Sequence, residues 1–330
     1  MPLTLTANRH FLAVISGALY FSFSFSAMAA DEYPSKSIKV VVPFPPGGIN
    51  DTVARPVLKK MGDILGTGFV VENKPGASGT IGTAQVGKAV ADGYTLLLGA
   101  ASTMAVVPHM IKNVTYNSAN DFVPVGGIAS VPSVLITGKK QDFPTYAAFV
   151  SAAKQKPSEL TFGSAGAGTS HHTQQSFLNL KQGIEMLHIP YKGSGPAMGD
   201  LLGGQIDFLM DPISTAIVQI QADKVRALGI TSDQRSPLLP NVPTFKELGV
   251  KDFEVSTWFG LFAPKGTPAA VIKKVESALG EALKDAEVKK FMDERGMNIL
   301  PKNSAEMQKF VQAENALWKD VVKKTRISID

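Results

Sequence analysis

Four turns of the chain combine glycine with short hydroxyl side chains, and this combination can bind an anion. The turns are "FPPGGIND" (44–51), "NKPGASGTIG" (73–82), "FGSAGAGTSHH" (162–172) and the less glycine-rich "GAASTMAV" (99–106). Glycine lets the backbone approach a ligand closely, and a helix start offers unpaired N–H groups at the positive end of its dipole. Hydroxyl groups near these helix starts come from Ser78, Ser102, Thr169 and Ser170. Such turns can hold an anion without Arg or Lys.

A structural reading of each turn is also open, because glycine and serine commonly form turns and helix caps. The first turn cannot continue a sheet, since Pro43, Pro45 and Pro46 lack backbone donors. The same pattern recurs at several strand-to-helix junctions of one chain. This recurrence favours an anionic small ligand.

Motifs for catalysis and metal binding are incomplete in this sequence. The stretch "GTAQVGKA" (82–89) is one residue from a phosphate-binding loop, but it ends in Ala89 and lies in a helical pattern. No G-x-S-x-G motif and no cysteine occur. His171 and His172 are adjacent, so on a helix they point about 100° apart and do not share a metal. We therefore predict no catalytic residues, no metal site and no cofactor.

Two acidic residues near the end of "IDFLMD" have two open readings. Asp207 and Asp211 could face a ligand cleft, or they could cap the following helix. The sequence does not decide between these alternatives.

The elements that must position these turns alternate between strand and helix patterns. The strand candidates are "IKVVVPF", "FVVEN", "YTLLLGA", "FVPVGGIA", "SVLITG", "LTFGSA", "MLHIPY", "IDFLMD", "VRALGIT" and "WFGLFAP". Most are continuously apolar, as in parallel strands that are covered on both faces. Amphipathic segments lie between them, and one opens with Thr267 as a predicted N-cap and Pro268 at the first helical position. The sequence predicts an α/β protein with two doubly wound lobes around a cleft.

The first thirty residues resemble a secretory signal peptide. A segment with one Arg and no acid precedes the apolar run "FLAVISGALYFSFSF", and Ala27 and Ala29 occupy the −3 and −1 positions. A membrane anchor is the alternative, but the apolar run is short and is interrupted by serines. We predict a cleaved signal peptide over 1–30 and a mature chain that is exported and not inserted in the membrane.

Composition excludes other classes of partner. The 330 residues carry a formal charge of +5, which falls to +4 without the leader. No run of five or more basic residues exists, so the sequence predicts no nucleic-acid binding. An exported domain without disulfides must rely on a large core, and 44% hydrophobic residues supply one.

Several longer stretches together resemble the Bug/TctC-type solute-binding proteins of tripartite tricarboxylate transporters. They are "YPSKSIKVVVPFPPGGINDTVAR", "VENKPGASGTIGTAQVGKAVADGYTLLLGAASTMAVVPHM", "GSAGAGTSHH", "HIPYKGSGPAMGDLLGGQIDFLMD", "LPNVPTFKELG" and "WFGLFAPKGTPAAVI". The resemblance implies a type II periplasmic-binding-protein fold that closes on a small organic acid, a di- or tricarboxylate. It also implies periplasmic location, delivery to a membrane permease and, we expect, a monomer.

The resemblance also implies a set of ligand-binding residues at the turns. Those expected from the first lobe are Phe44, Gly47, Gly48, Ile49, Ser78, Gly79, Ala100 and Ser102. Those expected from the second lobe are Ser164, Gly166, Thr169, His172, Tyr191 and Asp211. The lobes are expected at 31–130 plus 256–330 and at 131–255, with Trp258 near the second crossing between them.

The chain departs from the family pattern at a few positions. Pro56 stands early in the first helix, where it removes an intrahelical hydrogen bond. Ile49 and Met104 could make the pocket more apolar and favour aromatic acids such as terephthalate, or they could face away from the ligand. Two other functions stay open, namely an exported hydrolase and a ligand-sensing module for a membrane receptor.

Overall fold

The computed structural model describes Met1, residues 33–141 and residues 143–329. Contacts divide the chain into two units, Met1–Tyr33 and Pro34–Asp330, and the second unit contains all the described helices and strands. The predicted signal peptide lies outside the described residues, apart from Met1. Within the described part of the chain, no helix combines the length and the apolar character needed to cross a bilayer.

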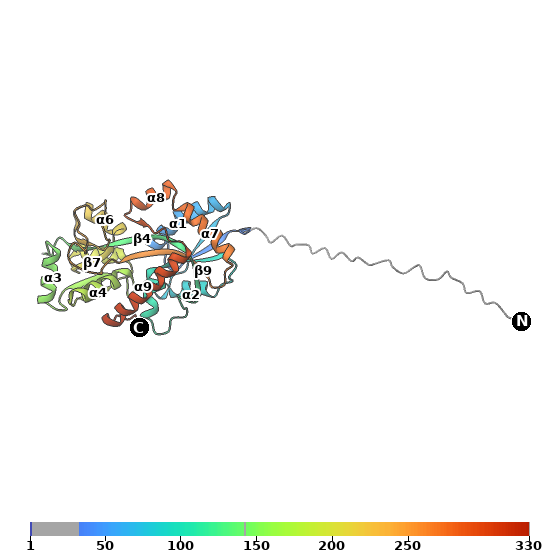
Figure 1. Ribbon diagram of the computed structural model, residues 1–330. Helices are drawn as coiled ribbons and strands as arrows, with labels where there is room; N and C mark the ends of the chain where they lie inside the picture. The colour runs from blue at the N-terminus through green and yellow to red at the C-terminus, as the bar shows by residue number, and fades with distance from the viewer. Residues whose placement is uncertain (2–32, 142, 330) are drawn as a thin grey trace. The chain divides into compact units, whose positions relative to one another are not determined.

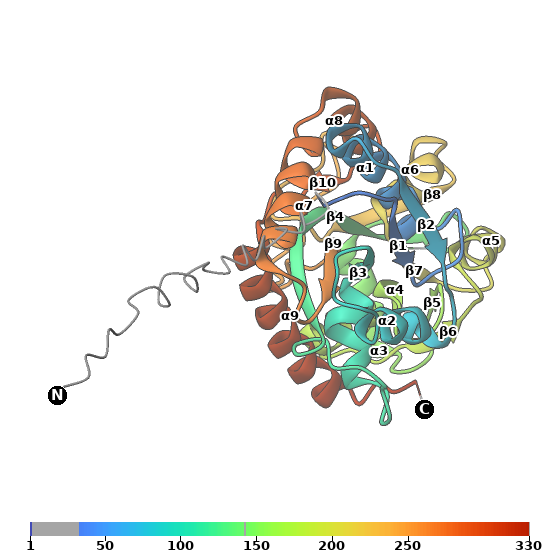
Figure 2. The same ribbon diagram turned by 90° about the vertical axis from the view of Figure 1, so that its right-hand side faces the viewer.

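The strands of the second unit form one mixed sheet (Figures 1 and 2). They are β1 (Ile38–Val42), β2 (Phe69–Asn73), β3 (Thr95–Ala100), β4 (Phe122–Gly138), β5 (Thr161–Ser164), β6 (Leu187–Pro190), β7 (Phe208–Pro212), β8 (Val225–Ile230), β9 (Ser256–Pro264) and β10 (Asn298–Ile299). Their order is β2-β1-β3-β9-β4-β7-β5-β6, and β8 and β10 also pair with β4.

The long strand β4 joins two halves of this sheet. Residues 122–132 of β4 pair with β9, whereas residues 133–138 pair with β7 and β8. The sequence predicted two separate strands here, which was wrong, because new partners continue the ladder where the old ones end. The predicted parallel pairs exist between β1 and β2, β1 and β3, β5 and β6, and β5 and β7. The two long strands run antiparallel to their neighbours.

Helices follow most of the strands, as the alternating pattern predicted. They are α1 (Ile49–Leu65), α2 (Thr80–Gly87), α3 (Tyr146–Gln155), α4 (Ser170–Gln182), α5 (Ser194–Gly203), α6 (Ile213–Gln221), α7 (Ala269–Ala282), α8 (Ala286–Asp293) and α9 (Ser304–Thr325), with the short turns η1 (Ala77–Gly79), η2 (Ser102–Val106) and η3 (Val107–His109). Helix α1 continues through Pro56. The predicted cap of α7 was wrong, because the Thr267 hydroxyl donates to the Pro264 carbonyl and the helix begins one residue later.

The core explains why the runs of the central strands are apolar throughout. In β1, Ile38, Val40, Val41 and Val42 have no exposed surface, because β2 and β3 flank the strand and helices cover it. In the other half of the sheet the Phe208 ring packs 4.4 Å from that of Phe149, centroid to centroid. Burial of such side chains from water stabilises the fold.

Helix α9 runs beside β4 and η2 and reaches α4, as Figure 1 shows in red. Trp318 of α9 meets Phe177 of α4 edge to face, with the centroids 6.0 Å apart. Glu314 of the same helix accepts hydrogen bonds from Trp258 Nε1 of β9 at 2.8 Å and from Trp318 Nε1 at 3.3 Å. Burial raises the pKa of Glu314 above its usual value. One carboxyl group therefore fixes β9 to α9.

Replacing Glu314 with Ala is expected to lower the free energy of unfolding by about 2–4 kcal/mol, because two buried indole N–H groups lose their acceptor. Trp258 and Trp318 have 0% and 2% of their surface exposed, so water cannot replace the acceptor that their indole N–H groups lose. Urea unfolding monitored by tryptophan fluorescence measures the change. Glu314→Gln keeps an acceptor oxygen and should lose less than half as much. Equal losses in both variants would contradict this role.

Candidate functional site

The turns after β1, β2 and β3 converge on Gly79. A Cβ atom at this position would lie 2.7 Å from Thr103 Cγ2 and 3.0 Å from Phe44 Cζ, and the backbone has φ +88°. Only glycine fits this approach without displacing its neighbours. Phe44, Gly79 and the start of η2 therefore lie close together.

The opening turn is held by a polar network that sequence reasoning missed. Asp51 accepts hydrogen bonds from Gly47 N at 3.1 Å, Arg55 Nε at 2.8 Å and Asn73 Nδ2 at 3.0 Å. Asn73 Nδ2 also donates to the Phe44 carbonyl at 3.1 Å. The hydrogen bond from Arg55 is the main cause that lowers the pKa of Asp51 to about 2. The i, i+4 spacing of Asp51 and Arg55 could have indicated this pair.

The other predicted residues of this turn lie at the beginning of α1. Gly48 is exposed and occupies the N-cap position, with no side-chain cap on the helix. Ile49 is the first helical residue and is half-buried. The first N–H groups of α1 have no intrahelical acceptor.

The turn before α2 has a left-handed backbone at two residues other than glycine. Ala77 has φ 46° and Ser78 has φ 55°, a conformation that costs about 1–2 kcal/mol per residue. Ser78 Oγ lies 3.5 Å from the carbonyl oxygen of Ala167, in the turn after β5. The strained turn thus brings a predicted ligand-binding hydroxyl to the other half of the sheet.

The turn after β3 places one predicted residue in the core and one near the surface. Ala100 is 2% exposed, and its N–H bonds to Thr103 Oγ1 at 3.2 Å. Ser102 is half-buried. Met104 has no exposed surface and belongs to the hydrophobic core, which favours the alternative in which Met104 faces away from a ligand.

The turn after β5 is closed by its own hydroxyl groups. Thr169 Oγ1 donates to the Gly166 carbonyl at 2.6 Å, and Gly166 N donates to Ser164 Oγ at 3.1 Å. Ser164 is fully buried and lies 2.7 Å from His188 Nε2. Ser164 therefore shapes the turn, while Thr169 stands at the N-cap of α4 without capping it.

His172 is engaged in packing inside the protein. Its ring stacks on His188 with centroids 3.9 Å apart and planes within 5°, and its Nδ1 accepts a hydrogen bond from Gly168 N at 3.2 Å. Burial, together with the neighbouring ring, lowers the pKa of His172 to about 3, and burial lowers that of His188 to about 4. His172 supports the turn through Gly168, and no free Nδ1 is left to bind a ligand.

Tyr191 and Asp207 also have partners. The Tyr191 hydroxyl donates to Asp200 Oδ2 at 2.6 Å, and burial, with the bond to Asp200, raises its pKa to about 12. Asp207 Oδ2 accepts from both N and Oγ1 of Thr161, each at 2.8 Å. Asp207 thus joins β5 to the start of β7. The sequence suggested only that it faces a ligand cleft or caps a helix, and neither alternative anticipated this contact.

Asp211 has no exposed surface, and both of its oxygens have donors. His171 Nε2 lies 2.8 Å from Oδ1, and Thr215 Oγ1 donates to Oδ2 at 2.5 Å. Ser194 Oγ lies 3.0 Å from the same His171 nitrogen. A hydrolytic triad needs serine and aspartate on opposite ring nitrogens. This Ser–His–Asp group therefore lacks the geometry of a hydrolase.

The helices that start at glycine-rich turns have no side-chain cap, and the same holds for α6 and α7 elsewhere in the described chain. Side chains cap α3, α8 and α9, from Thr145, Asp285 and Asn303. No side chain caps α1, α4 or α5, whose N-cap residues are Gly48, Thr169 and Gly193. Uncapped N–H groups are donors for an anion. Within the described chain, no group of three or more His, Asp or Glu side chains is placed to hold a metal ion.

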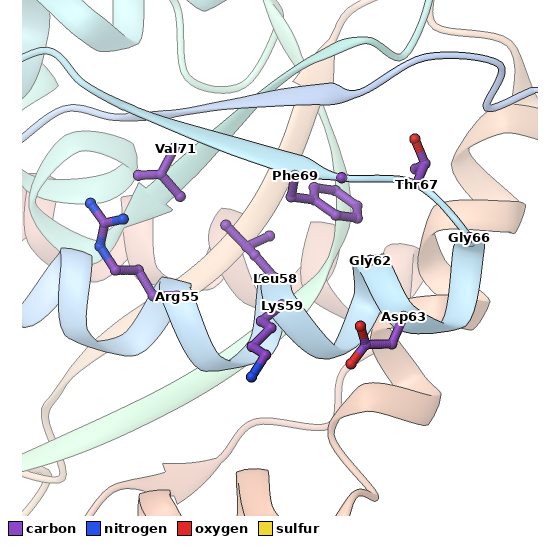
Figure 3. A pocket seen from close by; sticks show the side chains of 10 residues that line it. Arg55, Leu58, Lys59, Gly62, Asp63, Gly66, Thr67, Phe69 and Val71 are labelled. Atoms are coloured by element: carbon purple, nitrogen blue, oxygen red, sulfur yellow. The ribbon is translucent and has the colours of Figure 1, made fainter.

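A hollow between α1 and β2 is lined by no residue of these turns (Figure 3). Arg55, Leu58 and Lys59 of α1 and Phe69 and Val71 of β2 are among its lining residues. In Figure 3, Leu58 points toward β2, whereas Lys59 and Asp63 point away from it. None of the predicted site residues lines this hollow, so it lends no support to the predicted site.

Comparison with protein families identifies one matching model over most of the chain. The model described as "Tripartite tricarboxylate transporter family receptor" matches residues 53–327. A protein in the tcbD-tcbE intergenic region of Pseudomonas sp. strain P51 is 38% identical over 97% of this chain and 95% of its own. Protein BugT of Bordetella pertussis is 36% identical over 95% of this chain and 97% of its own.

Solved structures share the fold. The periplasmic binding protein BugD has 37% identity and a TM-score of 0.80, covering 90% of this chain and 99% of its own. Rpa4515 of R. palustris with adipate has 32% identity and a TM-score of 0.82, covering 90% of this chain and 99% of its own. MatC of Rhodopseudomonas palustris with malate has 32% identity and a TM-score of 0.79, covering 88% of this chain and 100% of its own. They confirm the predicted two-lobe α/β fold of a periplasmic binding protein.

Proposed function

The chain belongs to the tripartite tricarboxylate transporter receptor family, and from this premise we propose that it is an exported receptor for a small dicarboxylate. The family and its structural neighbours are substrate-binding proteins, which confirms the prediction of a binding protein over an enzyme. The receptor would deliver its ligand to a membrane permease from the periplasm, as a monomer released from its signal peptide.

The observation that carries this proposal is the set of uncapped helices at the glycine-rich turns. The starts of α1, α4 and α5 keep their N–H donors free of side-chain caps. Arg55, which lies beside the opening turn, is already engaged by Asp51 at 2.8 Å. Backbone donors therefore remain for an anion, and two separated helix starts suit a ligand with a carboxylate at each end.

The ligand class follows from the relatives together with the packing at the turns. Related structures are described with malate and with adipate, which are aliphatic dicarboxylates of four and six carbons. Met104 is buried in the core, so of the two apolar residues only the half-buried Ile49 still supports an aromatic acid. We infer an aliphatic dicarboxylate as the ligand, with terephthalate as the aromatic acid to test beside it.

Binding would close two lobes over the ligand. We propose lobes at 31–130 plus 256–330 and at 131–255, and the change of partners along β4 between Pro132 and Ser133 supports this division. The contact of Ser78 Oγ with the Ala167 carbonyl at 3.5 Å would then join the lobes. A ligand that contacts both lobes favours the closed state by its difference in affinity for the two states.

A thermal-shift screen of the mature protein tests the proposed function. The panel contains malate, adipate, citrate, terephthalate, benzoate and aspartate, added to protein refolded to remove bound ligand. A ligand at about 100 times its Kd stabilises the folded state by about 2.7 kcal/mol, which is several degrees in Tm. We expect the shift with an aliphatic dicarboxylate. A screen in which no acid shifts Tm would contradict the proposal.

A further inference from the structure

His171 is a buried histidine at the start of α4 that the predicted site did not include. It has 5% of its surface exposed, and its Nε2 lies 2.8 Å from Oδ1 of the fully buried Asp211. Ser194 Oγ lies 3.0 Å from the same nitrogen. The imidazole therefore connects the start of α4 with the end of β7 and the start of α5, at the edge where ligands bind in α/β folds.

The hydrogen bonds assign the proton on one side of the ring. Oδ2 of Asp211 accepts from Thr215 Oγ1, and Oδ1 as a carboxylate oxygen can only accept. Nε2 must therefore carry the hydrogen that it shares with Oδ1. The other nitrogen, Nδ1, is buried and has no hydrogen-bond partner among the described residues. A buried polar atom without a partner costs free energy, which a ligand atom at this position would remove.

The surroundings of His171 favour an anion as that ligand. Helices α4, α5 and α6 all begin around this group, and none of them has a side-chain cap. A carboxylate that arrives at the uncapped helix starts would thus meet a histidine nitrogen that has no partner among the described residues.

Resting on the proposed function, we propose that His171 is a ligand-binding and specificity-determining residue. Its Nδ1 takes up a proton from solvent when the ligand binds and donates it to a ligand carboxylate, while Nε2–H stays on Asp211. Ligand binding is then coupled to the uptake of one proton, and affinity rises as the pH falls toward the range in which histidine titrates.

The neighbouring titratable groups of α4, β6, α5 and α9 do not supply this proton. Glu314 of α9, a helix that packs against α4, already accepts from Trp258 and Trp318. His172 and His188 have pKa values near 3 and 4, so they stay neutral around pH 7. From α5, Asp200 holds the Tyr191 hydroxyl, whose pKa is near 12. Helix α6 contains no charged residue, and β7 contributes only Asp211.

Isothermal titration calorimetry with malate and with adipate tests the inference. At about pH 7, each acid is titrated in PIPES and in Tris, buffers that differ in their enthalpy of ionisation. The slope of the measured enthalpy against that ionisation enthalpy gives the protons taken up, and we expect about one per ligand. His171→Gln should abolish proton uptake and weaken binding by about tenfold to a hundredfold.

His109→Gln is the matched control, because His109 lies in η3 and contacts Asn315 at 3.2 Å. This variant should keep both the affinity and the proton uptake of the wild type. Binding by the wild type with no proton uptake would overturn the role of His171 and leave the proposed function intact. Uptake that persists in His171→Gln would overturn it as well. No binding of either acid would instead remove the proposed function on which the inference rests.

Discussion

Replacing Gly48 with Asp is expected to weaken dicarboxylate binding by about a hundredfold to a thousandfold without lowering stability. The new carboxylate would stand at the N-cap of α1 and accept hydrogen bonds from the N–H groups that are proposed to bind the ligand. It would also repel the ligand's own carboxylate. Two like charges about 4 Å apart near a protein surface repel each other by about 4 kcal/mol. Calorimetric titration with malate and adipate measures the loss.

The structure allows this substitution without strain. Gly48 has φ −73° and ψ 172°, an extended conformation open to any residue, and a Cβ atom would lie 3.5 Å from the Pro45 carbonyl oxygen. An acidic N-cap and the loss of a glycine each stabilise the folded state, and together they add up to about 1 kcal/mol. Stability and affinity should therefore change in opposite directions, a result that general damage to the fold cannot produce.

Two further variants separate the effect of charge from that of capping. Gly48→Asn caps the helix without adding a charge and should weaken binding by only about tenfold. Thr145→Asp changes the cap of α3, where the threonine side chain already accepts from Ala148 N at 3.1 Å, and should leave affinity unchanged. Unchanged affinity in Gly48→Asp would exclude the start of α1 from the ligand site.

Acid is expected to destabilise the protein between about pH 6.5 and pH 4 through the stacked pair His172 and His188. Histidine has an ordinary pKa of 6.5, whereas the folded rings titrate near 3 and 4. Between these values the unfolded chain binds more protons, so the stability that is complete above pH 6.5 declines as the pH falls. Each ring contributes a slope of about 1.4 kcal/mol per pH unit, which urea unfolding at several pH values measures.

A double variant isolates this contribution. His172→Asn keeps an acceptor in the place of Nδ1 for Gly168 N, and His188→Gln keeps a partner in the place of Nε2 for Ser164 Oγ. The doubly substituted protein cannot titrate at these positions, so its stability should vary much less over the same range. Asp51 does not confuse the result, because its stabilising effect is lost only as the pH falls from about 3.8, its ordinary pKa, toward about 2, its pKa in the folded protein. Parallel pH profiles for the two proteins would contradict the assignment.

Local patterns were sufficient to predict much of the fold. Apolar runs, most of them continuous, predicted nine of the strands, because a central strand with both faces covered has no polar face to alternate. The pattern did not indicate β10, since two residues are too few to show a period. The antiparallel direction of β4 and β9 was also missed, because direction depends on partners more than a hundred residues apart in the chain.

The sequence by itself determined where the turns of the candidate site lie, because glycine content, hydroxyl residues and helix starts are local properties. Tertiary packing decided what each side chain does there. His171 and His172 are neighbours in the chain. Yet His171 stands against Asp211 with a nitrogen that has no partner among the described residues, and His172 is stacked on His188. Composition cannot separate them, because their roles depend on residues from other strands that folding brings within hydrogen-bond or stacking distance.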